Sequence, residues 1–213
     1  MKPSPSFDAA FREQLYDLFL WRRDVRRFRS ESIPADILTD LLRAATLAPS
    51  VGLSEPWRFV LVEDRRYRVQ VRQSFVTANH EALAGYEGER ARLYASLKLE
   101  GLDHAPVQLA VYCDGKTAQG HGLGQKTMPE TLTYSVVASI QMLWLAARAY
   151  GLGLGWVSIL DPSQVNTALH TPESWNLVAY LCLGYPAEES SRPKLAEVGW
   201  EQRRDLSDFV FRR

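Results

Sequence analysis

The sequence predicts one mixed α/β domain, and three observations support this expectation. The chain has 213 residues, which is enough to bury a core of ordinary size. Short apolar runs typical of buried strands alternate with longer stretches whose apolar residues recur at helical spacing. No internal repeat and no second hydrophobic core is evident, so we expect residues 1–213 to form a single domain with excursions.

Two helices are predicted in the first fifty residues, on either side of an arginine-rich segment at 22–28. The first runs from Phe7 to about Arg22, and the second runs from Pro34, which suits a first helical turn, to Pro49. The apolar residues of the first helix recur at helical spacing, at Phe11, Leu15, Leu18 and Phe19.

Two strands and a long helical excursion are predicted in the middle of the chain. Residues 58–62 and 107–113 are apolar runs of strand length. Residues 64–100 are polar and helical, and the part from about 85 to 100 is a candidate lid. A flexible, glycine-rich and polar loop is expected over 114–129.

The most apolar helix of the chain is predicted over residues 131–150. Apolar residues surround it on almost all sides, which is typical of a helix that is buried on two faces. In a protein of this size we therefore expect a partner subunit to cover one face. The glycine run 151–155 closes this helix, and a short strand is expected over 157–160.

The last elements are short. A helix is predicted over 161–170, and a buried strand over 177–183 ends at a Gly-Tyr-Pro turn. The tail from Ala187 is polar and is expected to be mostly solvated, although its basic residues could bring a second set of charges to an anion: Arg192, Lys194, Arg203 and Arg204. Its apolar residues at 209–211 are expected to add an edge strand.

Composition and charge exclude several classes of function. Lys plus Arg number 25 and Asp plus Glu number 25, and this zero net charge argues against a nucleic-acid or membrane-surface protein. No signal-peptide pattern, uninterrupted membrane-length apolar run or metal motif is evident. Cys113 and Cys182 lie inside apolar runs, so we expect buried thiols in a reducing, cytoplasmic compartment.

The segment 22–28 is the strongest candidate for a binding site. Its four arginines crowd fixed positive charge together, and a guanidinium can donate two parallel hydrogen bonds to a phosphate. A solvated basic turn is the alternative, because runs of charge usually face solvent. Asp24 lies among these arginines, either as a spacer that reduces repulsion or as a carboxylate held for a task. The chain as a whole is not basic, so a small phosphorylated ligand fits better than a polymer.

Two further stretches suit a large or flat ligand. The loop 48–57 is rich in proline and serine and is expected to be ordered. The glycine run 151–155 ends a helix and enters a strand, so it is not a dinucleotide fingerprint; a plain helix stop is its alternative interpretation. Ser158 alone is more typical of a satisfied hydroxyl than of a nucleophile, and Trp57 and Trp156 are expected to fill the core. The residues by themselves predict an anion site but no reaction.

Taken together, these segments resemble the nitroreductase-like flavoprotein family over nearly the whole chain. In that family an arginine-rich motif holds the phosphate of FMN, a Ser/Pro loop ending in Pro-Trp runs beside the flavin, and a glycine-rich turn covers the ring. The matching stretches here are 22–28, 49–57 and 151–158, in the same order. The resemblance implies an α+β nitroreductase-like fold, with a mostly antiparallel sheet flanked by helices, in a homodimer with FMN at the interface.

Several longer matches resemble the branch of this family that cleaves its flavin. They include Ala-Pro-Ser-Val-Gly-Leu at 48–53, Leu-Lys-Leu-Glu-Gly at 97–101 and Gly-Trp-Val-Ser-Ile at 155–159. Asp24 stands where ordinary nitroreductases usually carry serine. The resemblance implies that reduced FMN is a substrate, which dioxygen converts to 5,6-dimethylbenzimidazole, the lower ligand of cobalamin, and erythrose 4-phosphate.

The resemblance also implies roles for single residues. Asp24 is expected to act as a base near the ribityl carbons, kept ionised by its arginine neighbours, and Ser158 to face the flavin ring. The expected flavin contacts are Arg22, Arg23, Asp24, Val25, Arg26, Ser50, Gly52, Gly155, Trp156, Val157, Ser158 and Arg203.

Two alternatives stay open from the sequence. One is an ordinary NAD(P)H-dependent nitroreductase or flavin reductase, in which FMN survives many turnovers. The other is a non-catalytic protein that binds FMN without oxygen-dependent chemistry. Reduced FMN is expected either from NAD(P)H on this protein or from a separate flavin reductase.

Overall fold

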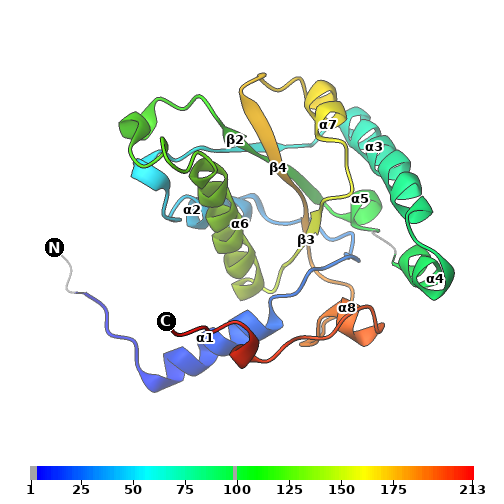
Figure 1. Ribbon diagram of the computed structural model, residues 1–213, viewed down its shortest axis with the longest axis horizontal. Coiled ribbons are helices and arrows are strands. Elements are labelled where there is room, and N and C mark those ends of the chain that lie inside the picture. The colour runs from blue at the N-terminus through cyan, green and yellow to red at the C-terminus, as the bar shows by residue number, and fades with distance from the viewer. Residues whose placement is uncertain (1–3, 98–99) are drawn as a thin grey trace.

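An antiparallel sheet with helices on both faces organises the chain (Figure 1). The computed structural model describes residues 4–97 and 100–213, and its strand order within them is β1-β2-β4-β3. All three strand pairs are antiparallel, so the predicted fold class is confirmed. The strands are β1 Trp57–Leu61, β2 Val107–Asp114, β3 Gly153–Val157 and β4 Trp175–Gly184.

The helices before the tail lie close to their predicted positions, whereas α8 in the tail was not predicted. Two helix starts have local causes. The Asp8 carboxylate accepts a hydrogen bond from the Phe11 amide at 2.8 Å, and Asp161 caps its helix in the same way. The helices are α1 Ala9–Trp21, α2 Ala35–Ala45, α3 Arg65–Ala84, α4 Gly88–Ser96, α5 Gly101–His104, α6 Thr131–Ala149, α7 Pro162–Leu169 and α8 Lys194–Glu197. Shorter turns are η1 Val51–Leu53, η2 Gln119–Gly122 and η3 Leu206–Asp208.

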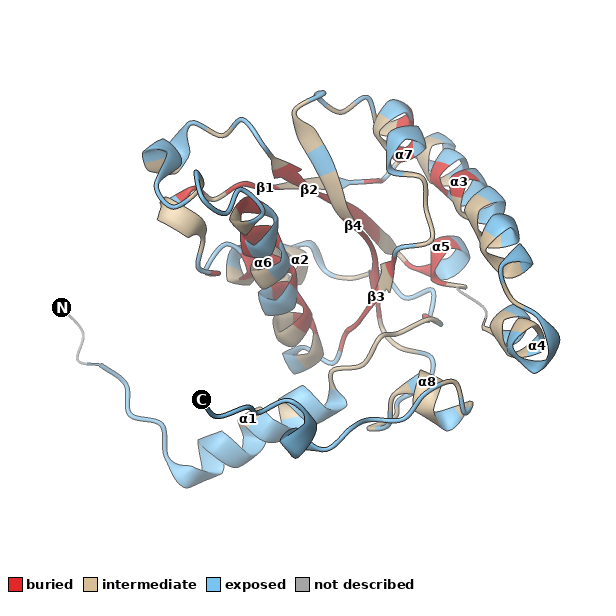
Figure 2. Cartoon of the chain, viewed as in Figure 1, coloured by how far each residue is buried: buried red, intermediate tan, exposed pale blue. Residues whose placement is uncertain are grey.

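The sheet separates two apolar clusters, where the sequence suggested one core. Because side chains alternate along a strand, Leu109 and Val111 of β2 pack toward α2 and α6, while Ala110 and Tyr112 pack toward α3, α5 and α7. Figure 2 shows the buried residues concentrated on the strands and on the helix faces that cover them. The core therefore has two halves on the two faces of one sheet.

Two predicted strands are corrected. The strand expected over 157–160 begins earlier, and β3 contains the glycines themselves. Residues 209–211 form no strand and are exposed in this chain. Residues 98 and 99, which belong to the candidate lid and to the 97–101 match, lie outside the described residues.

One face of α6 remains uncovered in the single chain. Its inner face, which includes Val136 and Ile140, is fully buried. On the other face Tyr134 is 57% exposed, Val137 41% and Met142 37%. The helix is thus apolar on both sides, as the sequence indicates, but this chain covers only one of them.

Candidate functional site

The arginine-rich segment 22–28 lies along the outer edge of β3. The Arg22 amide closes α1 by donating to the Leu18 carbonyl at 2.9 Å. The chain then turns onto the sheet, where Asp24 pairs with Leu154 in a parallel bridge and the Val25 amide donates to the Leu154 carbonyl at 3.0 Å. This bridge fixes the position of Asp24 relative to the strand.

The glycines of β3 make this close approach possible. A Cβ atom at Gly155 would overlap the Val25 carbonyl oxygen, and one at Gly153 would lie 2.5 Å from the Val25 Cγ2 atom. The glycine run was expected to admit a large or flat ligand. In this chain the group that approaches it is Val25. Gly155 was predicted as a flavin contact, and the structure gives it a separate reason to be glycine.

The Asp24 carboxylate is held by two donors. Its Oδ1 atom accepts from the Trp156 amide at 3.0 Å, and its Oδ2 atom accepts from Arg26 Nε at 3.4 Å. The side chain is 38% exposed, yet the surrounding protein is close enough for burial to be the strongest influence on its acidity. Burial raises the pKa of Asp24, and the opposing effects of the Trp156 amide, Arg26 and Arg22 are smaller.

This balance corrects one expectation from the sequence. The arginines do favour the ionised form of Asp24, as predicted, but burial outweighs them and the pKa rises. A carboxylate with a raised pKa is a stronger base than a free one. The arrangement is thus better suited to accepting a proton than the sequence indicated.

Three arginines near this carboxylate act on one another's charge, namely Arg22, Arg23 and Arg203. The Arg22 guanidinium lies 4.9 Å from the centre of the Trp144 ring, and Arg23 donates to the Ser191 carbonyl at 3.0 and 2.5 Å. Burial and the charge of Arg203 lower the pKa of both arginines. Within the described residues none of the three forms a salt bridge, so an anion would relieve their repulsion.

A cavity of about 710 Å³ opens beside Asp24. Residues 23–27 form its floor, and Ser96, Leu97 and Glu100 line one wall. A second wall comes from the tail between Glu188 and Val198. This volume is in the range of pockets that hold a cofactor-sized molecule.

Only four of the predicted flavin contacts line this cavity, namely Arg23, Asp24, Val25 and Arg26. The others do not line it: Arg22, Ser50, Gly52, Gly155, Trp156, Val157, Ser158 and Arg203. Ser158 directly follows β3 and is exposed, whereas the Val157 side chain is buried in the core on the α3 side. Ser50 and Gly52 lie in the loop at η1, which in Figure 1 is the cyan turn on the left. There the Val51 amide donates to Ser135 Oγ of α6 at 3.0 Å. The single chain thus holds Ser50 and Gly52 against α6.

Two tryptophans behave differently from each other. Trp57 is 7% exposed and belongs to the core, as predicted. Trp156 is only partly buried, and its ring lies 6.5 Å from that of Trp144. Trp156 contributes its backbone amide to Asp24, a role that the sequence does not reveal.

Residues 19–185 match the family model described as the nitroreductase family. The chain belongs to the nitroreductase family. The resemblance inferred from the motifs is thereby confirmed.

The curated relatives of this nitroreductase-family chain include synthases. It is 55% identical to the 5,6-dimethylbenzimidazole synthase of Rhodospirillum rubrum, over 96% of this chain and 97% of the relative. It is 44% identical to the protein of the same name from Rhodobacter capsulatus, over 92% and 95% of the two chains. Among solved structures, an iodotyrosine deiodinase bound to FMN and 3-iodo-L-tyrosine is similar with a TM-score of 0.73, at 27% identity and over 93% and 97% of the two chains.

The tail contributes more to this nitroreductase-family site than the sequence indicated. From the sequence a solvated tail was favoured, with Arg192 and Lys194 only as candidates for an anion site, and the structure places both of them at the cavity. Arg27 also connects the two walls, since its guanidinium contacts Glu100 at 3.1 Å and Glu188 at 2.8 Å. The basic residues of the tail are the sequence signal that pointed to this wall.

Residues 4–97 and 100–213 contain neither a membrane-spanning helix nor a candidate metal cluster. No helix there combines the length and the apolar character that a membrane span requires. No group of three or more His, Cys, Asp or Glu side chains in that part of the chain is arranged to hold a metal ion.

Proposed function

We propose that this protein cleaves reduced FMN with dioxygen to give 5,6-dimethylbenzimidazole and erythrose 4-phosphate. The reaction supplies the lower ligand of cobalamin. The relatives named 5,6-dimethylbenzimidazole synthase, which match over nearly their whole length, support this assignment. The structural observation that carries it is the Asp24 carboxylate, fixed on β3 at the edge of a cavity and beside unpaired arginines.

The residues at the site fit FMN. Arg22, Arg23 and Arg203 would hold the phosphate, because their charges lack carboxylate partners among the described residues. The cavity of about 710 Å³ has room for the remainder of the molecule. When bound, FMN supplies both the ring and the ribityl chain that the reaction separates.

Asp24 is the residue that we assign to proton transfer. Its raised pKa suits a general base, and the Trp156 amide keeps one of its oxygens oriented. Ser158 follows Trp156 by two residues and would present its hydroxyl to the ring from the end of β3. Dioxygen is the proposed co-substrate, and NAD(P)H acts here or through a separate flavin reductase.

The proposed functional unit is a homodimer. The uncovered apolar face of α6 supports a subunit interface, and α1, which buries none of its residues, supports a second contact. The loop with Ser50 and Gly52 is held at Ser135 near the start of α6, whereas Arg22 of the same chain packs on Trp144 further along that helix. We therefore place the 48–57 loop of one copy against the arginine segment of the other, with FMN between them.

Val137→Glu is expected to weaken this dimer. A carboxylate on the uncovered face of α6 would lose its hydration in the interface, which should raise the dissociation constant by about tenfold or more. Light scattering across a dilution series measures this change. Val76→Glu is the matched control, because Val76 on α3 is equally exposed, at 41%. Equal dimer stability in both variants would contradict the placement of the interface.

Arg203→Gln is expected to weaken FMN binding by about tenfold and to leave riboflavin binding unchanged. The physical reason is that riboflavin lacks the phosphate on which Arg203 would act. Fluorescence titration of both flavins measures the difference. Arg204→Gln, at the next position along the same exposed segment, is the control. An equal loss for FMN and riboflavin would remove Arg203 from the phosphate site.

The fate of the flavin absorbance tests the proposed function. Purified protein is mixed under air with FMN, NADH and a separate flavin reductase, and the yellow absorbance is followed after NADH is exhausted. We expect the FMN absorbance to be lost in proportion to protein-dependent turnover. Full recovery of FMN with NADH consumption in the absence of the added reductase would instead indicate a flavin reductase. Binding of FMN without any oxygen-dependent change would indicate a binding protein.

A further inference from the structure

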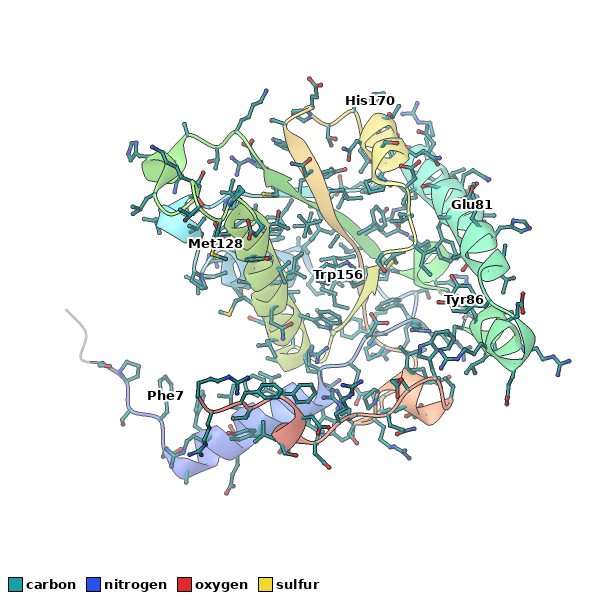
Figure 3. The ribbon with its side chains drawn as sticks, in the orientation of Figure 1. Phe7, Glu81, Tyr86, Met128, Trp156 and His170 are labelled. Carbon is teal, nitrogen blue, oxygen red and sulfur yellow. The ribbon has the colours of Figure 1, made fainter. Side chains whose placement is uncertain are left out.

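Three aromatic side chains from two distant parts of the chain meet beside the cavity. The rings of Tyr86 and Tyr94 stack with their centres 5.0 Å apart. Trp200 lies edge-on to Tyr86, at 5.5 Å, and 6.5 Å from Tyr94. The Arg90 guanidinium lies 5.6 Å from the Trp200 ring. Figure 3 shows Tyr86 near the right-hand margin of the molecule, where α3 leads into α4.

These aromatic residues join the two walls of the cavity. Tyr86 precedes α4 and Tyr94 belongs to it, while the end of α4 lines the cavity at Ser96. Trp200 follows α8, whose Lys194 lines the second wall. Figure 1 shows α4 and α8 at the same end of the molecule.

Each side of the cluster is also anchored to the body of the protein. The Tyr94 hydroxyl donates to Asn79 Oδ1 of α3 at 3.0 Å, which ties α4 to a helix that packs on the sheet. The Trp200 amide donates to the Leu195 carbonyl at 2.8 Å and closes the turn after α8, and Arg23 at the sheet edge donates to the Ser191 carbonyl ahead of that helix at 3.0 Å. The rings therefore connect two anchored segments and are not the end of a free tail.

We propose that Tyr86, Tyr94 and Trp200 form an aromatic latch that holds α4 against the tail and keeps the cavity closed around the flavin. This inference rests on the proposed function and deepens it, because it makes Trp200 a positioning residue for the oxygen step. Arg27 forms a second link between the walls through its ion pair with Glu188. The side chains of Arg27 and Glu188 are both more than half exposed. Exposed ion pairs hold weakly, so the ring contacts are the stronger connection.

Closure matters because reduced flavin has a competing reaction with oxygen. In that reaction reduced FMN gives two electrons and two protons to dioxygen, and the products are oxidised FMN and hydrogen peroxide. A site that excludes water and retains its substrate favours the productive route. A loosened latch should therefore raise the share of hydrogen peroxide and release FMN faster.

Trp200→Ala tests the latch with two readouts. We expect FMN to dissociate about tenfold faster, as measured by stopped-flow fluorescence, since two ring contacts are lost. We also expect more hydrogen peroxide for each dimethylbenzimidazole formed. Trp200→Phe retains a ring and should stay close to the wild-type chain in both respects. Unchanged dissociation and unchanged product share in Trp200→Ala would overturn the proposal.

Tyr86→Ala removes the opposite ring and gives an independent test if Trp200→Ala does not fold. It should produce the same two changes, and the double variant should be no worse than either single one, because the same contact is lost. Fully additive effects would contradict a shared latch. If the wild-type protein binds FMN but forms no benzimidazole, the proposed function fails, while the dissociation rates still decide whether the latch exists.

Discussion

Asp24→Asn is expected to bind FMN and to form 5,6-dimethylbenzimidazole at least about a hundredfold more slowly than the wild-type chain. The amide oxygen of asparagine can still accept the hydrogen bond from the Trp156 amide, so the segment should stay on β3. Asparagine cannot accept the proton that we assign to Asp24. Product formation by mass spectrometry and FMN affinity by fluorescence separate these two effects.

The stability of the same variant provides its internal control. Because burial raises the pKa of Asp24 in the folded protein, ionising it opposes folding as the pH rises through that pKa. Asp24→Asn removes this cost, so its melting temperature at neutral pH should not fall. Asp36→Asn, on the exposed first turn of α2, should leave product formation unchanged. A fully active Asp24→Asn protein would exclude Asp24 as the base.

Gly155→Ala is expected to lower the free energy of unfolding by about 1–3 kcal/mol and to abolish most of the activity. The added Cβ atom would overlap the Val25 carbonyl oxygen, so the arginine segment must move away from β3. That movement breaks the hydrogen bond between Asp24 and the Trp156 amide. Urea denaturation and the rate of product formation measure the two effects.

Gly85→Ala is the matched control for this prediction. Gly85 has φ −81°, which any residue adopts, and a Cβ atom there would lie 3.4 Å from the nearest oxygen, an ordinary contact. Its stability and activity should remain those of the wild-type chain. If Gly155→Ala were as stable and as active as Gly85→Ala, the close approach of Val25 to β3 would not be what positions Asp24.

The sequence predicted the elements whose pattern is local. Helical periodicity located α2 and α6, and apolar runs located β2 and β4, because these elements bury regular stripes of side chains. The sequence analysis misplaced β3, because glycine is unfavourable in strands. The glycines of β3 are needed for the close approach of Val25, which is far away in the sequence. The strand predicted at 209–211 has no partner strand in this chain.

The site was predicted in part for similar reasons. The arginines and Asp24 form a local motif. Arg203 was expected among the flavin contacts; its charge acts on Arg22 and Arg23, and its role toward the flavin stays a prediction. The direction of the Asp24 pKa was predicted wrongly, because burial is a property of the folded chain. The tail wall of the cavity was given too little weight, because only the fold brings Arg192 and Lys194 to the cavity. The roles of Ser50, Gly52 and Ser158 stay predictions.

The most direct test of the proposed function is mass spectrometry of the product. The purified protein is incubated with excess FMN, NADH and a separate flavin reductase, once under air and once without oxygen. The proposed function predicts dimethylbenzimidazole under air in proportion to the FMN consumed, and none without oxygen. Intact FMN under air, with no dimethylbenzimidazole, would contradict it.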